Sequence, residues 1–466
     1  MRLLFIKPRF IERGLNVITP PIGLAYLASY LREREKDAKI KILDMLFHNE
    51  EDLIDEIKNF SPDVVGISSL TVEADSMHRI ALLTKRISRN IVVVAGGPHP
   101  TLFPRDVLSD GNIDYVVKGE GEKTFHELFI SLYGGRKPYD VKGIFYRRNG
   151  EIIFTGDREP IYDLDSIPFP AWDLLEVEKY RITRKFTLVR SEFKYLPIFT
   201  SRACPYGCIY CHRIFGRGFR KRSPQNVIAE MEEFIGRFGI EKFEVIDDIF
   251  NLDEERAKAI CEEIIKRKWK ILLSFPNGLR GDRLSFDTIS LLRKAGTYYI
   301  SFAIESASER IQKLIKKNLD IQKTLKAIED AVKMGIFTMG YFMLGFPTET
   351  EDEIRLTIEC AKRSKLHIAL FFIVTPFKGT ELYETYVGDA FIPYKRHHYH
   401  TDHYNLSAVD TKTLKELYKL AYRKFYSSPY RAFRILRDYP TGKAGIIKQF
   451  LSLFIEGFTT PEKMRY

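Results

Sequence analysis

The stretch YLPIFTSRACPYGCIYCHRIFG, residues 195–216, joins a short apolar run to a loop that carries Cys204, Cys208 and Cys211. The chain has 466 residues and only five cysteines, so this clustering is informative. Disulfides are typical of secreted proteins, and the N-terminal residues MRLLFIKPRFIERG lack a signal-peptide pattern. No apolar run approaches the roughly 20 residues that a membrane-spanning helix needs. We therefore expect a cytoplasmic protein in which the clustered thiols bind metal.

The number of ligands in this loop favours an iron–sulfur cluster. A structural zinc site needs four Cys or His ligands, usually in two separate pairs, and the loop offers three thiols with His212 as a fourth ligand beside them. An iron–sulfur cube held by three cysteines keeps one iron open for a small molecule. Pro205 and Gly207 indicate a tight loop and not a packed helix face. Zinc remains the alternative.

The residues that follow this loop alternate between short apolar strands and helices through six units. The strands are YLPIFTSRA, KFEVIDD, ILLSFPNG, YYISFAIES, FTMGYFMLGFP and IALFFIVTP. Six consecutive units predict a partial (βα)6 barrel of the TIM type, whose chemistry belongs at the carboxyl ends of the strands. The polar or small residues at those ends are Asp247, Asp248, Asn277, Glu305, Ser306 and Gly345.

The N-terminal part also alternates, with five β-branched runs separated by helical stretches, and this predicts a doubly wound parallel sheet. In such sheets ligands bind beyond the carboxyl ends of the strands. Glycines there let a ligand come close to the backbone and hydroxyls bind it, although the same glycines can serve only tight turns. The residues at these ends are Ser68, Ser69, Leu70, Thr71, Gly96, Gly97, Pro98, His99, Gly119, Glu120 and Gly121.

Four regions follow from these patterns in a chain of ordinary globular composition, 45% hydrophobic and 29% charged. They are the sheet domain (1–140), a connector with a hairpin at Asn149-Gly150 (141–190), the barrel (191–390) and a mainly helical C-terminal domain (391–466).

The C-terminal region carries much of the positive charge of the chain. It has 14 Lys and Arg against 6 Asp and Glu, a net charge of +8 out of +11, with aromatic residues among the charges. Its stretch AGIIKQFLSLFIEGF has one apolar helical face. A basic amphipathic helix can lie on an anionic membrane, or it can pack on the barrel. We expect no nucleic-acid partner because no nucleic-acid module accompanies the charge.

Other metal-ligating residues point less clearly to a site. The spacing of His397, His398, His400 and His403 is irregular, which favours an exposed or substrate-lining loop over a metal site, and their role is open. Cys261 and Cys360 fall in predicted helices, where small buried residues are common. We therefore expect a single cluster.

The CxxxCxxC loop after the first barrel strand, with Tyr210 before the third cysteine, resembles the radical S-adenosylmethionine superfamily. The N-terminal part resembles the cobalamin-binding domain of one large class of that superfamily. This class includes anaerobic porphyrin ring cyclases, carbon and phosphinate methylases, and enzymes that modify hopanoid and archaeal lipids. Matching stretches run along nearly the whole chain: PPIGLAYLASYL, GGPHPT, VKGEGEKTF, LDSIPFPAW, RKRSPQNV, IESASERI, GFPTETEDEI and TPFKGTELYE.

The resemblance implies roles for the barrel residues. The three cysteines of the loop would hold a [4Fe-4S] cluster, whose open iron binds the amino and carboxylate groups of S-adenosylmethionine. The backbone of Tyr210 would lie near the adenine. Asp247 or Asp248 would replace the usual Gly-Gly-Glu contact to the ammonium group, and the sequence leaves open which. Glu305 and Ser306 would face the ribose and carboxylate, and Asn277 and Gly345 would complete the S-adenosylmethionine site.

The resemblance also implies cobalamin at the sheet domain. Ser68-Ser69-Leu70 and Gly96-Gly97 resemble the Ser-x-Leu and Gly-Gly elements that line the nucleotide tail of the cofactor. The Asp-x-His-x-x-Gly element is absent, and Lys7-Pro8-Arg9 stands in its place. We therefore expect that no imidazole ligates cobalt.

The function that the resemblance implies is methyl transfer to an unreactive carbon. One S-adenosylmethionine would methylate cobalamin, and a second would yield the radical that removes a hydrogen from the substrate. Two alternatives remain: ring formation or carbon–carbon coupling without methyl transfer, and a non-catalytic cluster or cobalamin sensor that binds a partner. The expected partners are an external electron donor and a small-molecule substrate, for which a lipid or an anion is favoured. Peripheral membrane contact through the C-terminus is part of this hypothesis.

Overall fold

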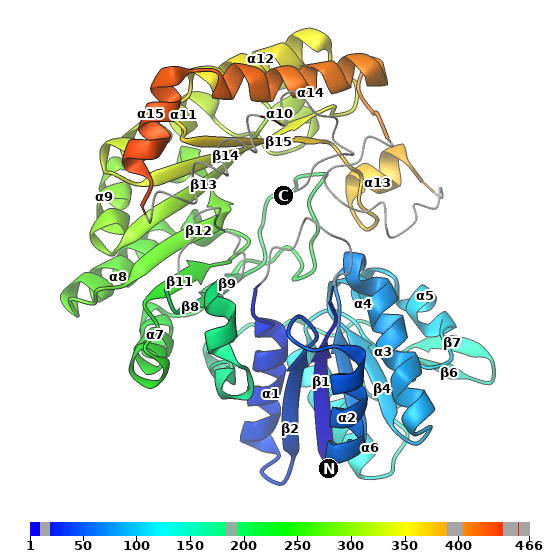
Figure 1. Cartoon of the computed structure of the whole chain (residues 1–466). Helices are drawn as coiled ribbons and strands as arrows, with labels where there is room; N and C mark the ends of the chain where they lie inside the picture. The colour runs from blue at the N-terminus through cyan, green and yellow to red at the C-terminus, as the bar shows by residue number, and fades with distance from the viewer. Residues whose placement is uncertain (10–18, 183–186, 188–192, 389–403, 441–454, 456–466) are drawn as a thin grey trace. The chain divides into compact units, whose positions relative to one another are not determined.

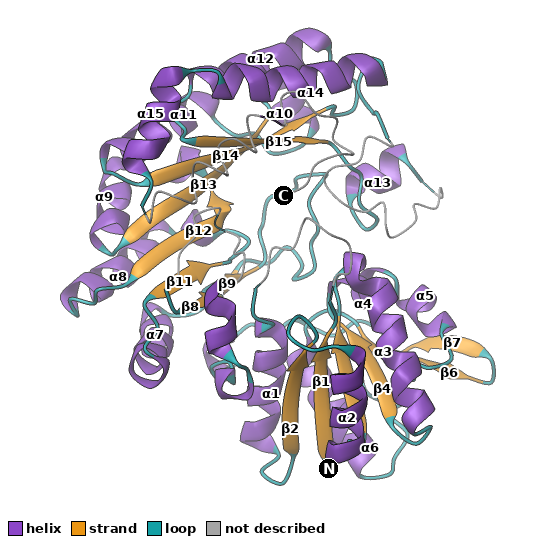
Figure 2. Cartoon of the chain, viewed as in Figure 1, coloured by secondary structure: helices purple, strands orange, loops and turns teal. Residues whose placement is uncertain are grey.

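The computed structural model describes residues 1–9, 19–182, 187, 193–388, 404–440 and 455. The chain forms two compact units: the first contains residues 1–9 and 20–177, and the second contains the described residues from 178 onward together with Thr19 (Figures 1 and 2). Each unit has its own β-sheet. Among the described residues, none of the helices combines the length and the apolar character needed to cross a bilayer.

The first unit is a seven-stranded sheet in the order β2-β1-β3-β4-β5-β6-β7. Its first five strands are parallel: β1 (Arg2–Lys7), β2 (Lys39–Asp44), β3 (Val64–Ser68), β4 (Val92–Gly96) and β5 (Tyr115–Val117). The helices are α1 (Ile22–Arg34), α2 (Glu50–Phe60), α3 (Ala74–Ile87), α4 (Pro98–Leu102), α5 (Pro104–Ser109) and α6 (Gly121–Tyr133). The strand order reverses between β1 and β3, which is the topological switch point of the sheet.

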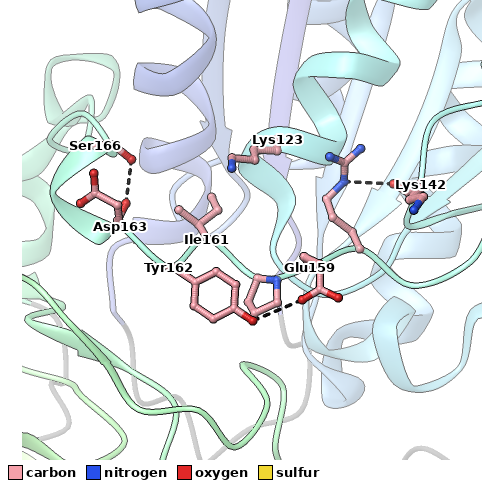
Figure 3. Close-up of a pocket in the computed structure, with 9 residues that line it drawn as sticks. Lys123, Lys142, Glu159, Ile161, Tyr162, Asp163 and Ser166 are labelled. Atoms are coloured by element: carbon pink, nitrogen blue, oxygen red, sulfur yellow. Dashed lines mark hydrogen bonds between the residues drawn. The ribbon is translucent and has the colours of Figure 1, made fainter.

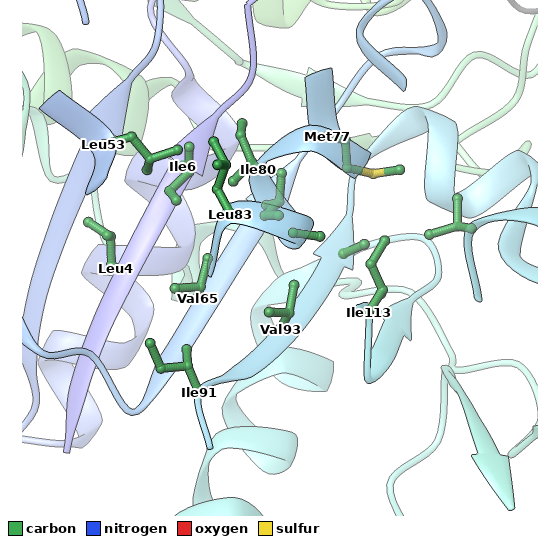
Figure 4. Close-up of a cluster of buried hydrophobic side chains, with 14 of the residues drawn as sticks. Leu4, Ile6, Leu53, Val65, Met77, Ile80, Leu83, Ile91, Val93 and Ile113 are labelled. Atoms are coloured by element: carbon green, nitrogen blue, oxygen red, sulfur yellow. The ribbon is translucent and has the colours of Figure 1, made fainter. Parts of the chain in front are cut away.

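Both faces of this sheet are buried, because successive strand residues point to opposite sides. Leu4 and Ile6 of β1 pack with residues of α2 and α3 on one face, in the cluster shown in Figure 4. Leu3 and Phe5 pack with residues of α1 and α6 on the other face. The predicted doubly wound sheet is confirmed.

The hairpin predicted inside the connector extends this sheet. β6 (Ile144–Arg148) pairs with β5 and with β7 (Glu151–Phe154), both antiparallel. Asn149 and Gly150 have φ of 53° and 84°, the left-handed conformation that a two-residue hairpin turn requires. The sequence places the end of the sheet domain at residue 140, whereas the first unit continues to Val177. β6 pairs with the edge of β5, so the backbone groups of that edge are not left without hydrogen-bond partners.

The second unit has a six-stranded, all-parallel sheet in the order β15-β14-β13-β12-β11-β8. The strands are β8 (Tyr195–Ile198), β11 (Lys242–Val245), β12 (Leu272–Leu279), β13 (Thr297–Glu305), β14 (Phe337–Leu344) and β15 (Ile368–Ile373). The helices between them are α7 (Pro224–Phe238), α8 (Glu254–Lys266), α9 (Phe286–Lys294), α10 (Glu309–Leu314), α11 (Ile321–Lys333) and α12 (Glu351–Arg363). This is the predicted partial barrel, curved as Figure 2 shows.

Helices also follow β15: α13 (Glu381–Tyr386), α14 (Thr411–Tyr426) and α15 (Pro429–Asp438). α14 closes the edge of the barrel sheet. The hydroxyl of Tyr422 accepts from the N–H of Phe371 at 3.2 Å and donates to its carbonyl at 3.1 Å. The hydroxyl of Tyr426 does the same at Ala369, at 3.2 and 2.9 Å. Tyr422 and Tyr426 are four residues apart, a rise of about 6 Å along a helix. Ala369 and Phe371 are two residues apart, about 6.6 Å along a strand, so both tyrosines can reach their partners.

Candidate functional site

The cysteine loop is anchored at the carboxyl ends of the barrel strands. It connects β9 (Ser201–Arg202) with β10 (Arg220–Lys221), which pair antiparallel. The N–H of Ile209 donates to the carbonyl of Ile315 at 3.1 Å, and the carbonyl of Ile209 accepts from Leu382 at 2.8 Å. The Ile209 side chain is buried in an apolar cluster that includes Ile315, Phe346 and Leu382. These contacts hold the loop across several strand ends.

The three thiols of the loop lie close enough to influence one another. The protein around Cys211 and the negative charges of Cys208, Asp248 and Cys204 together raise the pKa of Cys211 to about 12. Burial also raises the pKa of Cys204. Thiolates that repel one another ionise together only when bound cations compensate their charge, so metal binding must release protons. Within the described part of the chain, no three His, Cys, Asp or Glu side chains converge on one ion position, whereas the cysteines of a cube bind separate irons.

His212, the fourth ligand of the zinc alternative, has another contact. Its Nε2 lies 3.2 Å from the carbonyl oxygen of Lys378. A ring nitrogen facing a carbonyl must carry the proton and donate, so this nitrogen is not a metal ligand in this arrangement. The contact excludes Nε2 and leaves Nδ1 as the ring nitrogen that could bind zinc.

Two cations that the sequence analysis did not single out lie at the cysteine loop. The Arg280 guanidinium lies 4.0 Å from the ring centroid of Tyr206, inside the loop, and its positive charge lowers the pKa of Cys204. Asp282 and the carbonyl of Asn318 hold the Arg280 side chain. The positive charge of Lys317, which is 7% exposed, likewise lowers the pKa of Cys211. Both cations suit a site that holds an anionic cluster.

Lys317 also joins two of the predicted S-adenosylmethionine residues. Its Nζ lies 3.0 Å from Glu305 Oε1 and 3.2 Å from the Tyr210 hydroxyl, and the Tyr210 hydroxyl lies 3.3 Å from Glu305 Oε1. Glu305 ends β13 with φ of 66°, a left-handed conformation that is sparsely populated for residues other than glycine. A buried cation, carboxylate and hydroxyl together can bind both ends of an amino acid. The only sequence signal for Lys317 is the pair of lysines in IKKN, which carries no motif.

The structure separates Asp247 from Asp248. Asp247 is 3% exposed and accepts from the N–H of Thr200 at 2.6 Å and from the hydroxyls of Thr200 and Ser201. Asp248 is exposed and accepts one bond, from the N–H of Ala203 at 3.0 Å. The protein around Asp248 and the neighbouring Asp247 raise the pKa of Asp248 to about 6. Asp247 therefore ties the strand ends together, while Asp248 faces outward.

The other predicted barrel residues also divide into one that is exposed and two that bond within the fold. Asn277 is exposed, and its amide donates to the carbonyl of Ile246 at 2.7 Å. Ser306 is fully buried, with its hydroxyl 3.2 Å from Thr357 Oγ1. The N–H of Gly345 donates to Glu349 at 2.7 Å, and burial raises the pKa of this Glu349 carboxyl to about 7. Ser306 and Gly345 thus support the strand ends, and Asn277 can reach a ligand.

In the first unit, the predicted cobalamin residues gather at the ends of β3, β4 and β5, beside the switch point. Lys7, which ends β1, pairs with Glu73, and Glu73 accepts from the N–H of Leu70 at 2.8 Å. Leu70 follows β3 and is 46% exposed, which is unusual for a leucine at the centre of a sheet edge. Small residues and hydroxyls leave room and hydrogen-bonding groups for a large, amide-rich cofactor, and the exposed Leu70 offers it an apolar contact.

The glycines of this edge have different constraints. Gly97 has φ of 89°, and a Cβ there would lie 2.7 Å from Ser68 Oγ, so the fold itself requires glycine. A Cβ at Gly96 would meet Val117 at an ordinary 3.8 Å. A side chain at Gly97 would therefore disturb the fold itself, and Gly96 is the position where a side chain would report on a ligand.

The remaining predicted residues of this edge are tied into the fold. His99 is fully buried, and its ring centroid lies 5.0 Å from that of Phe103. Pro98 begins α4 and Thr71 begins a short 3-10 turn. The N–H of Gly119 donates to Thr101 Oγ1 at 3.0 Å, and Glu120 accepts from Ile161. Ser69 is buried, and Gly121 begins α6.

A separate surface cavity of about 400 Å³ lies in the first unit (Figure 3). It is lined by charged and polar residues and contains none of the predicted site residues. Arg158 in its wall donates to Glu127 at 2.9 Å and to the carbonyl of Lys142 at 3.2 Å. The lining residues are Lys123, Lys142, Arg158, Glu159, Pro160, Ile161, Tyr162, Asp163 and Ser166.

The His397–His403 cluster and the stretch AGIIKQFLSLFIEGF lie outside the described residues, apart from Ile455. Cys261 is buried among apolar residues of α7, α8 and the barrel strands, and Cys360 is half-buried in α12. Cys261 belongs to α8 and Cys360 to α12, two helices on the outer face of the barrel sheet.

Two protein-family descriptions match the chain: the B12 binding domain over residues 13–129 and the Radical SAM superfamily over residues 198–361. The chain is 33% identical over 440 residues to an uncharacterized methyltransferase of Pyrococcus horikoshii, covering 92% of this chain and 93% of that protein. It is 29% identical over 449 residues to the cytidylyl-2-hydroxyethylphosphonate methyltransferase of Streptomyces wedmorensis, covering 84% and 82%. It is 28% identical over 489 residues to the anaerobic magnesium-protoporphyrin IX monomethyl ester cyclase of Rubrivivax gelatinosus, covering 99% and 86%.

Solved structures share the fold. The radical enzyme OxsB with aqua-cobalamin and S-adenosylmethionine bound has a TM-score of 0.73 at 17% identity, over 99% of this chain and 75% of that chain. The methyltransferase TsrM of Kitasatospora setae with cobalamin and a [4Fe-4S] cluster bound has a TM-score of 0.67 at 18% identity, over 82% and 73%.

Proposed function

Because the chain belongs to the family of cobalamin-dependent radical S-adenosylmethionine methyltransferases, which has ring cyclases among its relatives, we propose that it transfers a methyl group to an unactivated carbon of a small molecule. When bound, the cluster supplies the electron that cleaves S-adenosylmethionine and cobalamin carries the methyl group. The observation that supports the proposal best is the anchored three-thiol loop beside the Lys317, Glu305 and Tyr210 contacts.

In this proposal, the barrel residues bind and orient S-adenosylmethionine. Cys204, Cys208 and Cys211 hold the cluster. Lys317 binds the carboxylate of S-adenosylmethionine, since it is a buried cation at the loop. Asp248 binds the ammonium group, because its outward carboxylate has only one hydrogen bond within the described residues.

The remaining barrel residues would act around these two groups. Glu305 keeps Lys317 in place and reaches the ribose, and the Tyr210 backbone lies near the adenine. Asn277 completes the site, while Ser306, Gly345 and Asp247 act through the scaffold. Apolar packing under the loop, through Ile209, excludes water from the reaction.

The first unit would hold cobalamin over the ends of β3, β4 and β5. Ser68 and Thr71 can donate hydrogen bonds to its polar groups, and the backbone at Gly96 allows close approach. Leu70 offers an apolar contact, fixed by the Glu73 and Lys7 pair. The boundaries at 190 and 390 remain part of this proposal, and the hairpin after residue 140 is counted in the first unit.

The finer proposal for the partners concerns the substrate and the membrane. Enzymes of this superfamily act on small molecules and take electrons from an external donor. We favour a lipid or an anionic substrate here, and peripheral contact with a membrane through the C-terminal region, because that region carries a net charge of +8.

The product mass tests the reaction. Protein reconstituted anaerobically with iron, sulfide and cobalamin would be incubated with dithionite, methyl-deuterated S-adenosylmethionine and the lipid and metabolite extract of a strain that lacks the gene. We expect 5′-deoxyadenosine, S-adenosylhomocysteine and a product that carries the deuterated methyl group. The matched control is the Cys208→Ala protein, which should form none of them.

Two other results would replace the proposal. A product that has lost hydrogen without gaining carbon would favour ring formation or coupling, the activity named for the cyclase relative. A protein with an intact cluster that releases no 5′-deoxyadenosine would favour the sensor.

A further inference from the structure

Helix α15 buries two of its three arginines together with Ile435, and exposes three other large apolar side chains. Arg431 and Arg434 are 6% and 4% exposed, whereas Tyr430 and Phe433 are 65% and 59% exposed and Leu436 is 39% exposed. Helices that pack on a barrel normally turn their apolar face inward. Two questions follow: which contacts hold the buried arginines, and which partner covers the exposed apolar side chains.

The buried arginines bind backbone carbonyls at the end of α12. Arg431 donates to the carbonyls of Leu366, Lys362 and Ser364, and Arg434 donates to the carbonyl of Lys365 at 2.7 Å. These carbonyls belong to or follow the last turn of a helix, where backbone acceptors lack helical donors.

Two further contacts fix the rotation of the helix. The Arg431 guanidinium also lies 3.8 Å from the ring centroid of Phe425 in α14. Asp438, the last residue of α15, lies 3.0 Å from His367 Nε2. Hydrogen bonds therefore set the orientation of α15, and Tyr430, Phe433 and Leu436 face outward as a consequence.

Exposed cations border this apolar face. Arg363 and Lys365 lie on the segment that receives the α15 arginines, and both are exposed. Arg437 lies next to Phe433, 5.9 Å from its ring centroid, and is paired with Asp438. Aromatic rings beside Lys and Arg are the composition of surfaces that sit at the headgroup level of a bilayer.

The position of α15 argues against an electron donor as the occupant. The helix contacts residues 362–367, which precede β15, so it lies at the amino ends of the barrel strands (Figure 1). The cysteine loop lies at the carboxyl ends, through Ile209 and Leu382. A protein bound at α15 would deliver electrons at the amino ends of the strands, opposite to the end that carries the cysteine loop.

We propose that the outward face of α15, formed by Tyr430, Phe433 and Leu436 with Arg363 and Lys365 at its border, docks on an anionic lipid bilayer. The inference deepens the membrane contact of the proposed function and rests on it, but it does not depend on methyl transfer. The aromatic and leucine side chains enter the interface, and the two cations bind lipid phosphates. This placement keeps the cluster end of the barrel away from the lipid, so of the two substrate classes proposed above it favours the anionic one.

Vesicle binding of the full-length protein tests the proposal. Co-sedimentation would be measured with phosphatidylcholine vesicles and with vesicles that also contain phosphatidylglycerol. We expect binding only to the anionic vesicles, weakened about tenfold or more by Tyr430→Ser with Phe433→Ser. Arg363→Glu with Lys365→Glu should weaken it by a similar factor. The matched control is Phe286→Ser with Leu356→Ser, which removes two side chains that are 52% and 51% exposed elsewhere in the same unit, and it should bind as the unchanged protein does.

Each outcome decides between occupants. If the unchanged protein ignores anionic vesicles, both this inference and the proposed membrane contact fail. If it binds and the Tyr430 and Phe433 changes have no effect, the contact lies elsewhere in the chain and only this inference fails. If those changes instead alter the sedimentation coefficient in the absence of lipid, the face joins two copies of the chain and the lipid inference is overturned.

Discussion

Lys317 is the residue whose change should separate binding from folding most clearly. Its Nζ bonds Glu305 and Tyr210, whereas the neighbouring Lys316 is exposed and pairs with Glu381. Lys317→Met should weaken the binding of S-adenosylmethionine to the cluster-loaded protein about tenfold or more, because a bond to a charged group contributes about 1.5–3 kcal/mol. Equilibrium dialysis checks this. Lys316→Met is the control, and equal affinities in the two variants would remove Lys317 from the site.

The cysteines give a second test at this scale. Cys204→Ala, Cys208→Ala or Cys211→Ala should abolish the broad iron–sulfur absorbance, because a cube held by two thiolates is labile. Cys261→Ala and Cys360→Ala should keep it, since both residues lie in helices on the outer face of the barrel. Loss of absorbance in either helical variant would indicate a second metal site.

A substitution at Gly96 tests whether cobalamin binds at the ends of β3, β4 and β5, because a side chain there does not clash with the fold. Gly96→Leu should keep the unit folded, because a Cβ there meets only ordinary contacts, and should weaken cobalamin binding about tenfold or more by filling the space above the edge. Gly111→Leu is the control, since Gly111 has open space around it and precedes β5 at the opposite edge. Titration of the cobalamin absorbance checks both. Unchanged affinity in Gly96→Leu would place the cofactor elsewhere.

At the scale of elements, the pairing of α14 with β15 is the contact that closes the barrel sheet. Tyr422→Phe and Tyr426→Phe should each lower the free energy of unfolding by about 1–3 kcal/mol, because each leaves a buried N–H and carbonyl of β15 without a partner. Hydrogen exchange at Ala369 and Phe371 should speed up in the corresponding variant. Tyr430→Phe, which changes an exposed ring, should leave both quantities unaltered. Unchanged exchange in Tyr422→Phe would mean that water replaces the hydroxyl.

For the whole molecule, Glu349 predicts how stability depends on pH. Burial raises the pKa of its carboxyl from an ordinary 4.5 to about 7, against the bonds from Gly345 and Phe346 that favour the charged form. The folded state therefore holds this proton more tightly, so the contribution is complete below pH 4.5 and is lost as the pH rises through 7. The free energy of unfolding should fall by roughly 3 kcal/mol across this window from this group.

Glu349→Gln provides the comparison for this pH dependence. The amide cannot titrate, so the difference in unfolding midpoint between the two proteins should change between pH 4.5 and 7 and stay constant above and below that window. Thermal unfolding across the pH range measures it. A difference that is independent of pH would show that Glu349 is charged in the folded protein.

The sequence by itself determined the features that depend on neighbouring residues. The three-thiol loop, the alternation of strands and helices, the left-handed turn at Asn149-Gly150 and the positions at the strand ends all follow from local spacing and backbone preference. Both sheets and the partial barrel could be predicted on this basis.

Only the tertiary structure decided which strand-end residues are exposed and how the elements dock. Asp247 and Asp248 are adjacent and chemically alike, and their roles separate only because Thr200 and Ser201 approach one of them. The bonds of Lys317 to Tyr210, 107 positions away, and of the α15 arginines to the end of α12 join segments whose contact no local pattern encodes. Hydrogen bonds between distant segments form only when the chain has folded, and they, not the apolar periodicity, set the orientation of these side chains.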